Sequence, residues 1–116
     1  MKDRIELNSI PRFINELLIL KAISSSDKHG YNISTFIEQG SENYFKMSYG
    51  TMYPILHSLE KQKYIQGNWS ADDSKRKKKT YSITNVGIAY LNENTIQIKS
   101  FMDRLNFMLE YNNEGN

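Results

Sequence analysis

The chain has 116 residues, an apolar content of 39% and a formal net charge of +2, which suits one small domain with an appended element. It contains no cysteine, which excludes disulfide frameworks, thiolate metal sites and cysteine nucleophiles. We find no signal peptide and no apolar run of roughly 18 residues. We therefore expect a cytoplasmic protein with no membrane partner.

The first half of the chain predicts two helices after a flexible N-terminal arm over residues 1–10. Apolar residues recur at helical spacing from Pro11, a good first helical residue, to Ile23, and the polar run 24–27 ends that helix. A second helix is predicted from about Gly30 to Gln39, with Gly40 able to supply a left-handed cap. Residues 43–47 form a connector that could hold one short strand.

A third helix is predicted to begin after Ser48, a natural N-cap that places Tyr49 and Thr51 in the first turn. Pro54 lies past that turn, where it costs a backbone hydrogen bond. The sequence therefore predicts either a distorted first turn or a later start.

The next segment predicts a β-hairpin. Residues 64–69 and 79–83 alternate as strands do, and a turn-rich loop over 70–74 separates them. Lys75, Arg76, Lys77, Lys78 and Lys79 follow, so five of the 15 Lys and Arg residues sit together. A helix with a polar start beside a cationic hairpin is what a winged helix-turn-helix uses in a major groove. We expect a mainly α fold with a small β-hairpin, the winged helix-turn-helix domain spanning residues 11–84.

A long C-terminal helix is predicted over residues 85–111, capped by Thr84 and followed by a frayed tail over 112–116. Its apolar residues follow a 3-4 spacing, which is typical of helix pairing. The alternatives are an intramolecular core, a membrane-surface helix or non-specific collapse, and the polar face is too weakly basic for a membrane anchor. The residues expected to mediate dimerisation are Phe13, Leu17, Ile88, Leu91, Ile98, Met102, Leu105 and Leu109.

Together these segments resemble the PadR family of bacterial transcriptional regulators. The resemblance covers about residues 12 to 110 and is carried by residues 17–20 (LLIL), 29–33 (HGYNI), 48–60 (SYGTMYPILHSLE), Trp69 and 81–87 (YSITNVG). It implies a dimer of winged helix-turn-helix domains, joined through the C-terminal helix, that represses promoters until an inducer binds. The single short C-terminal helix is similar to the compact branch of the family, which includes multidrug-sensing repressors.

The chain departs from the family pattern at three positions. Lys63 stands where the family usually has glycine, so we expect some strain at the bend before the wing. Thr80 replaces a usual tyrosine. Ile98 stands where multidrug-sensing relatives have a ligand-stacking tryptophan, and Trp69, the only tryptophan here, belongs to the wing.

The leading hypothesis is a dimeric, ligand-responsive repressor that binds double-stranded DNA. The predicted DNA-binding residues are His29, Tyr31, Ser48, Tyr49, Thr51, Tyr53, His57, Lys75, Arg76, Lys77 and Lys78. A candidate pocket for a small hydrophobic or aromatic inducer contains Ile98, Phe101 and Met102.

The competing hypothesis is a winged-helix module that binds a protein partner instead of DNA. An enzyme is not expected, because no nucleophile–base pair, phosphate-binding glycine loop or paired acid set is present. No cofactor or metal is expected, since the two histidines have no cluster of ligands near them.

Overall fold

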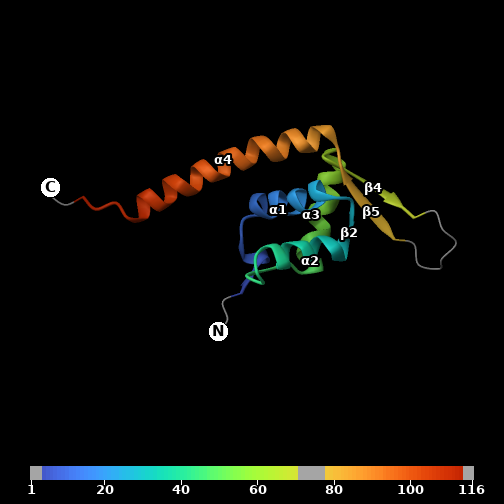
Figure 1. Cartoon of the computed structure of the whole chain (residues 1–116), viewed down its shortest axis with the longest axis horizontal. Helices are drawn as coiled ribbons and strands as arrows, with labels where there is room; N and C mark the ends of the chain where they lie inside the picture. The colour runs from blue at the N-terminus through green and yellow to red at the C-terminus, as the bar shows by residue number, and fades with distance from the viewer. Residues whose placement is uncertain (1–3, 71–77, 114–116) are drawn as a thin grey trace.

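The computed structural model describes residues 4–70 and 78–113, and their arrangement is shown in Figure 1. In chain order the elements are β1 (Ile5–Glu6), the 3-10 helix η1 (Leu7–Ser9), α1 (Arg12–Ser25), β2 (Lys28–His29), α2 (Gly30–Gly40), β3 (Phe45–Lys46), α3 (Tyr49–Lys61), β4 (Ile65–Trp69), β5 (Lys79–Ile83) and α4 (Asn85–Leu109). The expected fold class, mainly α with a small sheet and a long C-terminal helix, is confirmed.

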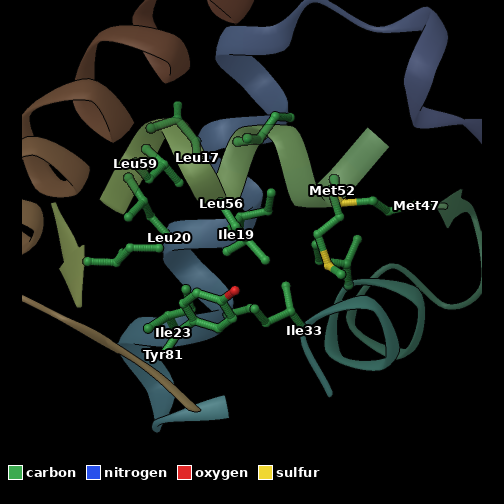
Figure 2. Close-up of a cluster of buried hydrophobic side chains, with 14 of the residues drawn as sticks. Leu17, Ile19, Leu20, Ile23, Ile33, Met47, Met52, Leu56, Leu59 and Tyr81 are labelled. Carbon is green, nitrogen blue, oxygen red and sulfur yellow. The ribbon is translucent and has the colours of Figure 1, made fainter. Parts of the chain in front are cut away.

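The core lies where α1, α2 and α3 meet the sheet (Figure 2). Ile19 and Leu20 of α1 and Leu56 of α3 are completely buried there. Tyr81 of β5 closes the cluster from the sheet side with 4% of its surface exposed. This packing fixes the directions of α3 and the hairpin relative to each other, because both rest on α1.

The N-terminal segment differs from the expected flexible arm. Ile5–Glu6 pairs in parallel with Phe45–Lys46, and Leu7 is completely buried in the core. The carbonyl of Leu7 also accepts a 2.8 Å hydrogen bond from Nδ2 of the buried Asn15. Burial of one leucine and this bond explain why residues 5–9 hold a defined position.

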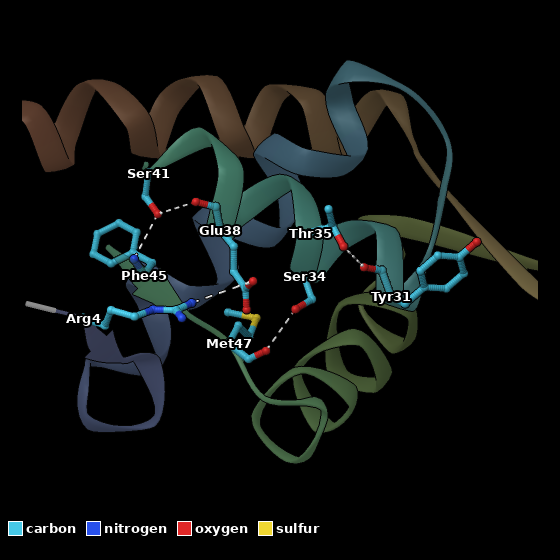
Figure 3. Close-up of polar contacts among 8 residues, drawn as sticks. All are labelled: Arg4, Tyr31, Ser34, Thr35, Glu38, Ser41, Phe45 and Met47. Atoms are coloured by element: carbon cyan, nitrogen blue, oxygen red, sulfur yellow. Dashed lines mark hydrogen bonds and ion pairs between the residues drawn. The ribbon is translucent and has the colours of Figure 1, made fainter. Parts of the chain in front are cut away.

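The turn after α2 also differs from expectation. Gly40 is still helical, and the left-handed residues are Glu42 (φ 55°) and Asn43 (φ 65°). The Asn43 N–H donates to the Glu38 carbonyl at 2.7 Å, which ends the helix. Figure 3 shows how the following connector is held: Ser41 Oγ accepts from the Phe45 N–H at 2.9 Å, and Ser34 Oγ donates to the Met47 carbonyl at 3.1 Å.

α3 begins directly after Ser48, whose Oγ accepts from the Thr51 N–H at 3.3 Å, as an N-cap does. The expectation of a later start is wrong, since Pro54 lies inside the continuous helix Tyr49–Lys61. Proline removes one bond of the helical ladder. The buried residues Met52, Ile55, Leu56 and Leu59 hold the remaining turns against the core.

The predicted hairpin is present, and it gains a third strand. β4 and β5 are antiparallel with Gly67 opposite Tyr81 and Trp69 opposite Lys79. β2 then pairs with the other edge of β5, with His29 opposite Thr80, which gives the order β2-β5-β4. A two-residue strand carries no alternation, so nothing in the sequence pattern indicates β2.

Lys63 lies in the turn between α3 and β4 with a φ of 68°, so the expected strain is located at this residue. A non-glycine residue pays a conformational cost in the left-handed region that glycine avoids. The side chain of Lys63 is exposed and therefore offers no packing in return.

We expect Lys63→Gly to raise the free energy of unfolding, because relief of the left-handed strain contributes about 1 kcal/mol. The greater conformational entropy of glycine in the unfolded chain offsets part of this gain. Urea denaturation measures this difference. Lys61→Gly, at the end of α3, is the matched control and should lower stability, because helical glycine is unfavourable. A Lys63→Gly protein that is less stable than the parent would contradict strain at this turn.

α4 leaves the domain after its first turns (Figure 1). Thr84 Oγ1 accepts from the Gly87 N–H at 3.0 Å, so the predicted N-cap is confirmed. The Tyr90 and Tyr64 rings stack at 4.2 Å and fasten this end to the hairpin. Residues 99–113 are all exposed. No helix among the described residues is long and apolar enough to cross a membrane.

Candidate nucleic-acid interface

A groove of about 620 Å³ runs between the start of α2, the outer face of α3 and the hairpin. Its lining is mostly aromatic and cationic: His29, Gly30, Tyr31, Tyr49, Tyr53, His57, Trp69, Lys78, Lys79 and Tyr81. We call this surface the aromatic groove. It brings together the predicted residues His29, Tyr31, Tyr49, Tyr53, His57 and Lys78 from three separate segments.

α3 supplies the floor of the aromatic groove. Tyr49 and Tyr53 are 53% and 42% exposed, and their rings meet edge to face with centroids 6.0 Å apart. His57 follows one turn later and is also exposed. Side chains four residues apart share one helical face, so these three project from α3 in the same direction.

Ser48 and Thr51 do not line the aromatic groove. The Ser48 hydroxyl caps α3 and donates to Thr51 Oγ1 at 3.1 Å. Their polar groups therefore stabilise the start of the helix that carries Tyr49 and Tyr53.

A glycine makes room for Tyr53. A Cβ added to the buried Gly30 would lie 2.3 Å from the Tyr53 hydroxyl oxygen and 2.9 Å from its Cζ. The absence of a side chain at Gly30 lets the Tyr53 ring cross the start of α2. The sequence shows the motif that contains Gly30, but it does not reveal this contact between α2 and α3.

The start of α2 is tied to the hairpin through His29. Its Nδ1 lies 3.2 Å from the Lys79 carbonyl and 3.3 Å from Thr80 Oγ1, and its ring stacks on Tyr31 at 6.0 Å. Figure 3 shows the Tyr31 ring projecting away from α2, while its carbonyl accepts from Thr35. His29 therefore links the start of α2 to β5, and it lines the aromatic groove beside the exposed Tyr31.

The hairpin forms the opposite wall. Trp69 is 62% exposed, and Lys78, the fourth residue of the basic run 75–79, is also exposed. Lys75, Arg76 and Lys77 lie outside the described residues. Sequence reasoning did not assign Trp69 to the interface; its place opposite Lys79 in the hairpin is the signal that could have done so.

Lys79 differs from the exposed Lys78. Its Nζ forms a 2.9 Å ion pair with Glu60 Oε1 of α3, and this hydrogen bond raises the pKa of Lys79 above its ordinary value. Burial raises the pKa of the neighbouring Tyr81 hydroxyl. Lys79 is therefore a cation and Tyr81 a neutral phenol near neutral pH, and the charge of Lys79 is paired with Glu60 of α3.

A model of the family described as "Transcriptional regulator PadR-like family" matches residues 19–93, which is more than half of the chain. The chain belongs to this family. Its members are transcriptional regulators and not enzymes. The match spans the aromatic groove, the described part of the hairpin and the first turns of α4.

Similar proteins agree with this placement. The PadR-like chain is 36% identical over 76 residues to an uncharacterized protein of Lysinibacillus sphaericus, covering 66% of this chain and 70% of that one. It is 30% identical over 89 residues to the transcriptional regulator YqjI of Escherichia coli, covering 77% of this chain but only 41% of YqjI. The chain therefore spans less than half the length of YqjI.

Solved structures show the same fold. A PadR-like transcriptional regulator from Bacillus cereus superposes with a TM-score of 0.70 at 29% identity, covering 87% of this chain and 96% of that one. A transcriptional regulator from Clostridium thermocellum gives a TM-score of 0.79 at 24% identity, over 91% and 99% of the two chains.

A second groove, of about 330 Å³, lies between the start of α1 and α4 of the PadR-like chain. Pro11, Phe13, Ile14, Gln97, Ile98 and Phe101 line it. We call it the α1–α4 groove. Two residues of the candidate inducer pocket, Ile98 and Phe101, belong to it, whereas Met102 does not.

The predicted dimerisation residues divide into two groups. Leu17 and Leu91 are each only 7% exposed and belong to the core of the single chain, so they offer little surface to a partner. Phe13, Ile88, Met102, Leu105 and Leu109 remain between 37% and 75% exposed. Ile98 falls between the two groups, because it is half-buried and packs against the core. Among the described residues no group of three or more His, Asp or Glu side chains could hold a metal ion.

Proposed function

We propose that this PadR-like chain is a dimeric, ligand-responsive repressor that binds an inverted-repeat operator in double-stranded DNA in the bacterial cytoplasm. The observation that carries the proposal is the aromatic groove, in which Tyr49, Tyr53 and His57 of α3 face the same space as Lys78 of the hairpin. A recognition helix can contact base edges, and a cationic wing beside it can contact phosphates; DNA recognition requires both kinds of contact.

In this proposal α3 enters the major groove. Tyr49, Tyr53 and His57 contact base edges, and Tyr31 contacts the adjoining backbone. Lys75, Arg76, Lys77 and Lys78 of the wing bind phosphates and fix the register. With four phosphate contacts, log affinity falls against log salt with a slope near −4, at roughly −0.9 per contact.

Dimerisation in this proposal uses the exposed apolar side chains of α4. Two recognition helices related by a two-fold axis require half-sites about 34 Å apart, or a multiple of that distance. The α1–α4 groove borders this interface and is lined by Phe13, Ile98 and Phe101, which suits a small hydrophobic or aromatic inducer. A ligand there would change the angle between the two winged domains.

The test is fluorescence anisotropy of the purified protein with its own upstream DNA and with a shuffled control, at two salt concentrations. Preference for the native sequence, weakened by salt, supports the proposal. Equal weak binding to both DNAs favours the alternative, a winged-helix module that binds a protein partner, and a pull-down would then identify the partner.

We expect Arg76→Ala combined with Lys77→Ala to weaken operator binding by about tenfold and to reduce the salt slope by about 1.8, because two phosphate contacts are lost. Anisotropy over a salt series measures both quantities. Lys21→Ala, which removes one positive charge from an exposed position of α1, is a control that should change neither. An unchanged slope in the double variant would remove these cations from the interface.

A further inference from the structure

The ion pair between Glu60 and Lys79 joins the last turn of the recognition helix α3 to the first residue of β5. The Nζ–Oε1 distance is 2.9 Å, and the two side chains are only 33% and 22% exposed for Glu60 and Lys79. The short distance and the partial burial of both side chains distinguish this ion pair from pairs that are fully exposed to solvent.

Aromatic rings hold the ammonium group from the hairpin side. Lys79 Nζ lies 5.5 Å from the centroid of Trp69 and 5.4 Å from that of Tyr81, distances at which a cation is attracted to a ring face. Residues 67, 69, 79 and 81 alternate onto one face of the paired strands, so Trp69, Lys79 and Tyr81 share that face.

Gly67 supplies the space for the pair. A Cβ at Gly67 would lie 2.2 Å from Lys79 Cε and 3.0 Å from Glu60 Oε2. The lysine stem therefore crosses the hairpin over a residue that has no side chain, and the Glu60 carboxylate reaches the ammonium from α3 through the same opening.

We propose that Glu60 and Lys79 form an internal brace that sets the angle between α3 and the wing, and that Lys79 binds no phosphate. The pair is a positioning device for the DNA-binding site, so the inference rests on the proposed function. Two adjacent lysines then have different roles. Lys78 is exposed and can contact a phosphate, whereas the charge of Lys79 is matched within the chain.

The brace has a distinct effect on DNA binding. A residue that contacts phosphate strengthens binding to operator and shuffled DNA alike and adds to the salt slope. A residue that orients the wing affects the operator more than shuffled DNA and leaves the slope unchanged, since it releases no counterion.

The experiment compares the full chain with Lys79→Gln, Glu60→Gln, their combination, and the neighbouring control Lys78→Gln. We expect Lys79→Gln and Glu60→Gln each to lower the operator-to-shuffled affinity ratio about threefold, and the combination to be no worse than either alone. Lys78→Gln should instead lower both affinities equally and reduce the slope by about 0.9.

Gly67→Ala is an independent probe, because it displaces the lysine without changing any charge. It should reproduce the reduced affinity ratio with the parental slope. A Lys79→Gln protein whose slope falls by about 0.9, with equal losses on both DNAs, would overturn the brace and make Lys79 a phosphate contact.

Failure of the proposed function gives a different result. If the parental protein does not distinguish its operator from shuffled DNA, the regulator proposal fails, and the brace is then judged by thermal unfolding of the parent, the two single variants and their combination without DNA. Non-additive melting temperatures, with each single variant lowered by about 2 °C, support the pair. Additive shifts overturn it.

Discussion

Leu105→Asp is expected to convert the dimer into monomers and to weaken operator binding by more than about 100-fold. Leu105 is 43% exposed in the single chain, and Phe101 and Met102 lie on the same side of α4 at 58% and 50%. A carboxylate in the centre of an apolar interface would have to be buried without a partner. A monomer binds one half-site and loses the avidity of the dimer, which commonly increases affinity by a factor of about 10² to 10⁴.

Light scattering after size-exclusion chromatography measures the mass, and anisotropy measures operator affinity. Ser100→Asp is the matched control, because it adds the same charge on the opposite side of α4. Neither substitution should disturb the protomer, since residues 99–113 are all exposed, and circular dichroism checks this. A Leu105→Asp protein that remains dimeric would place the interface elsewhere.

The elements that the sequence predicts well are those governed by local rules. Ser48 and Thr84 each cap a helix because a hydroxyl can satisfy a free N–H two or three residues later, and neither needs information from distant residues. The alternation in β4 and β5 likewise depends on neighbours along the chain. For the same reason the family motif over residues 48–60, which covers α3 and its cap, locates the floor of the aromatic groove.

The differences arise where distant segments meet. β1 and β2 are two residues long and exist because β3 and β5 present free edges to them. Leu17 and Leu91 have the helical spacing expected of interface residues, but they are buried in the core of the single chain. Periodicity alone does not show whether an apolar side chain packs against a partner chain or against its own.

The roles of the charged residues in the candidate site also depend on contacts between distant segments. Lys78 and Lys79 are indistinguishable within a run of cations, but the alternation of the strand directs Lys79 toward Glu60, 19 residues earlier. The contact between Gly30 and Tyr53 also depends on how α2 crosses α3. Residue types in the site were therefore predictable, while the separate roles of these residues required the tertiary structure.

Gly87→Ala is expected to lower the free energy of unfolding by about 3 kcal/mol and the melting temperature by roughly 10 °C. An added Cβ would lie 2.0 Å from the Tyr64 carbonyl oxygen and 2.8 Å from Ile83 Cγ1. The Tyr64 carbonyl cannot move away easily, because it accepts from the Thr84 N–H and from Thr84 Oγ1, both at 3.1 Å. α4 must therefore shift and weaken the stacking of Tyr90 on Tyr64.

Gly40→Ala is the control, because Gly40 is also helical and nothing lies within 4 Å of its added Cβ. Alanine there should raise stability by about 0.5 kcal/mol through its better helix propensity. Gly87 is also helical, so propensity alone predicts the same gain, and only the contact with Tyr64 predicts a loss. A lower melting temperature for Gly87→Ala in thermal unfolding would therefore support the close packing of α4 against the Tyr64 carbonyl. A higher melting temperature would contradict it.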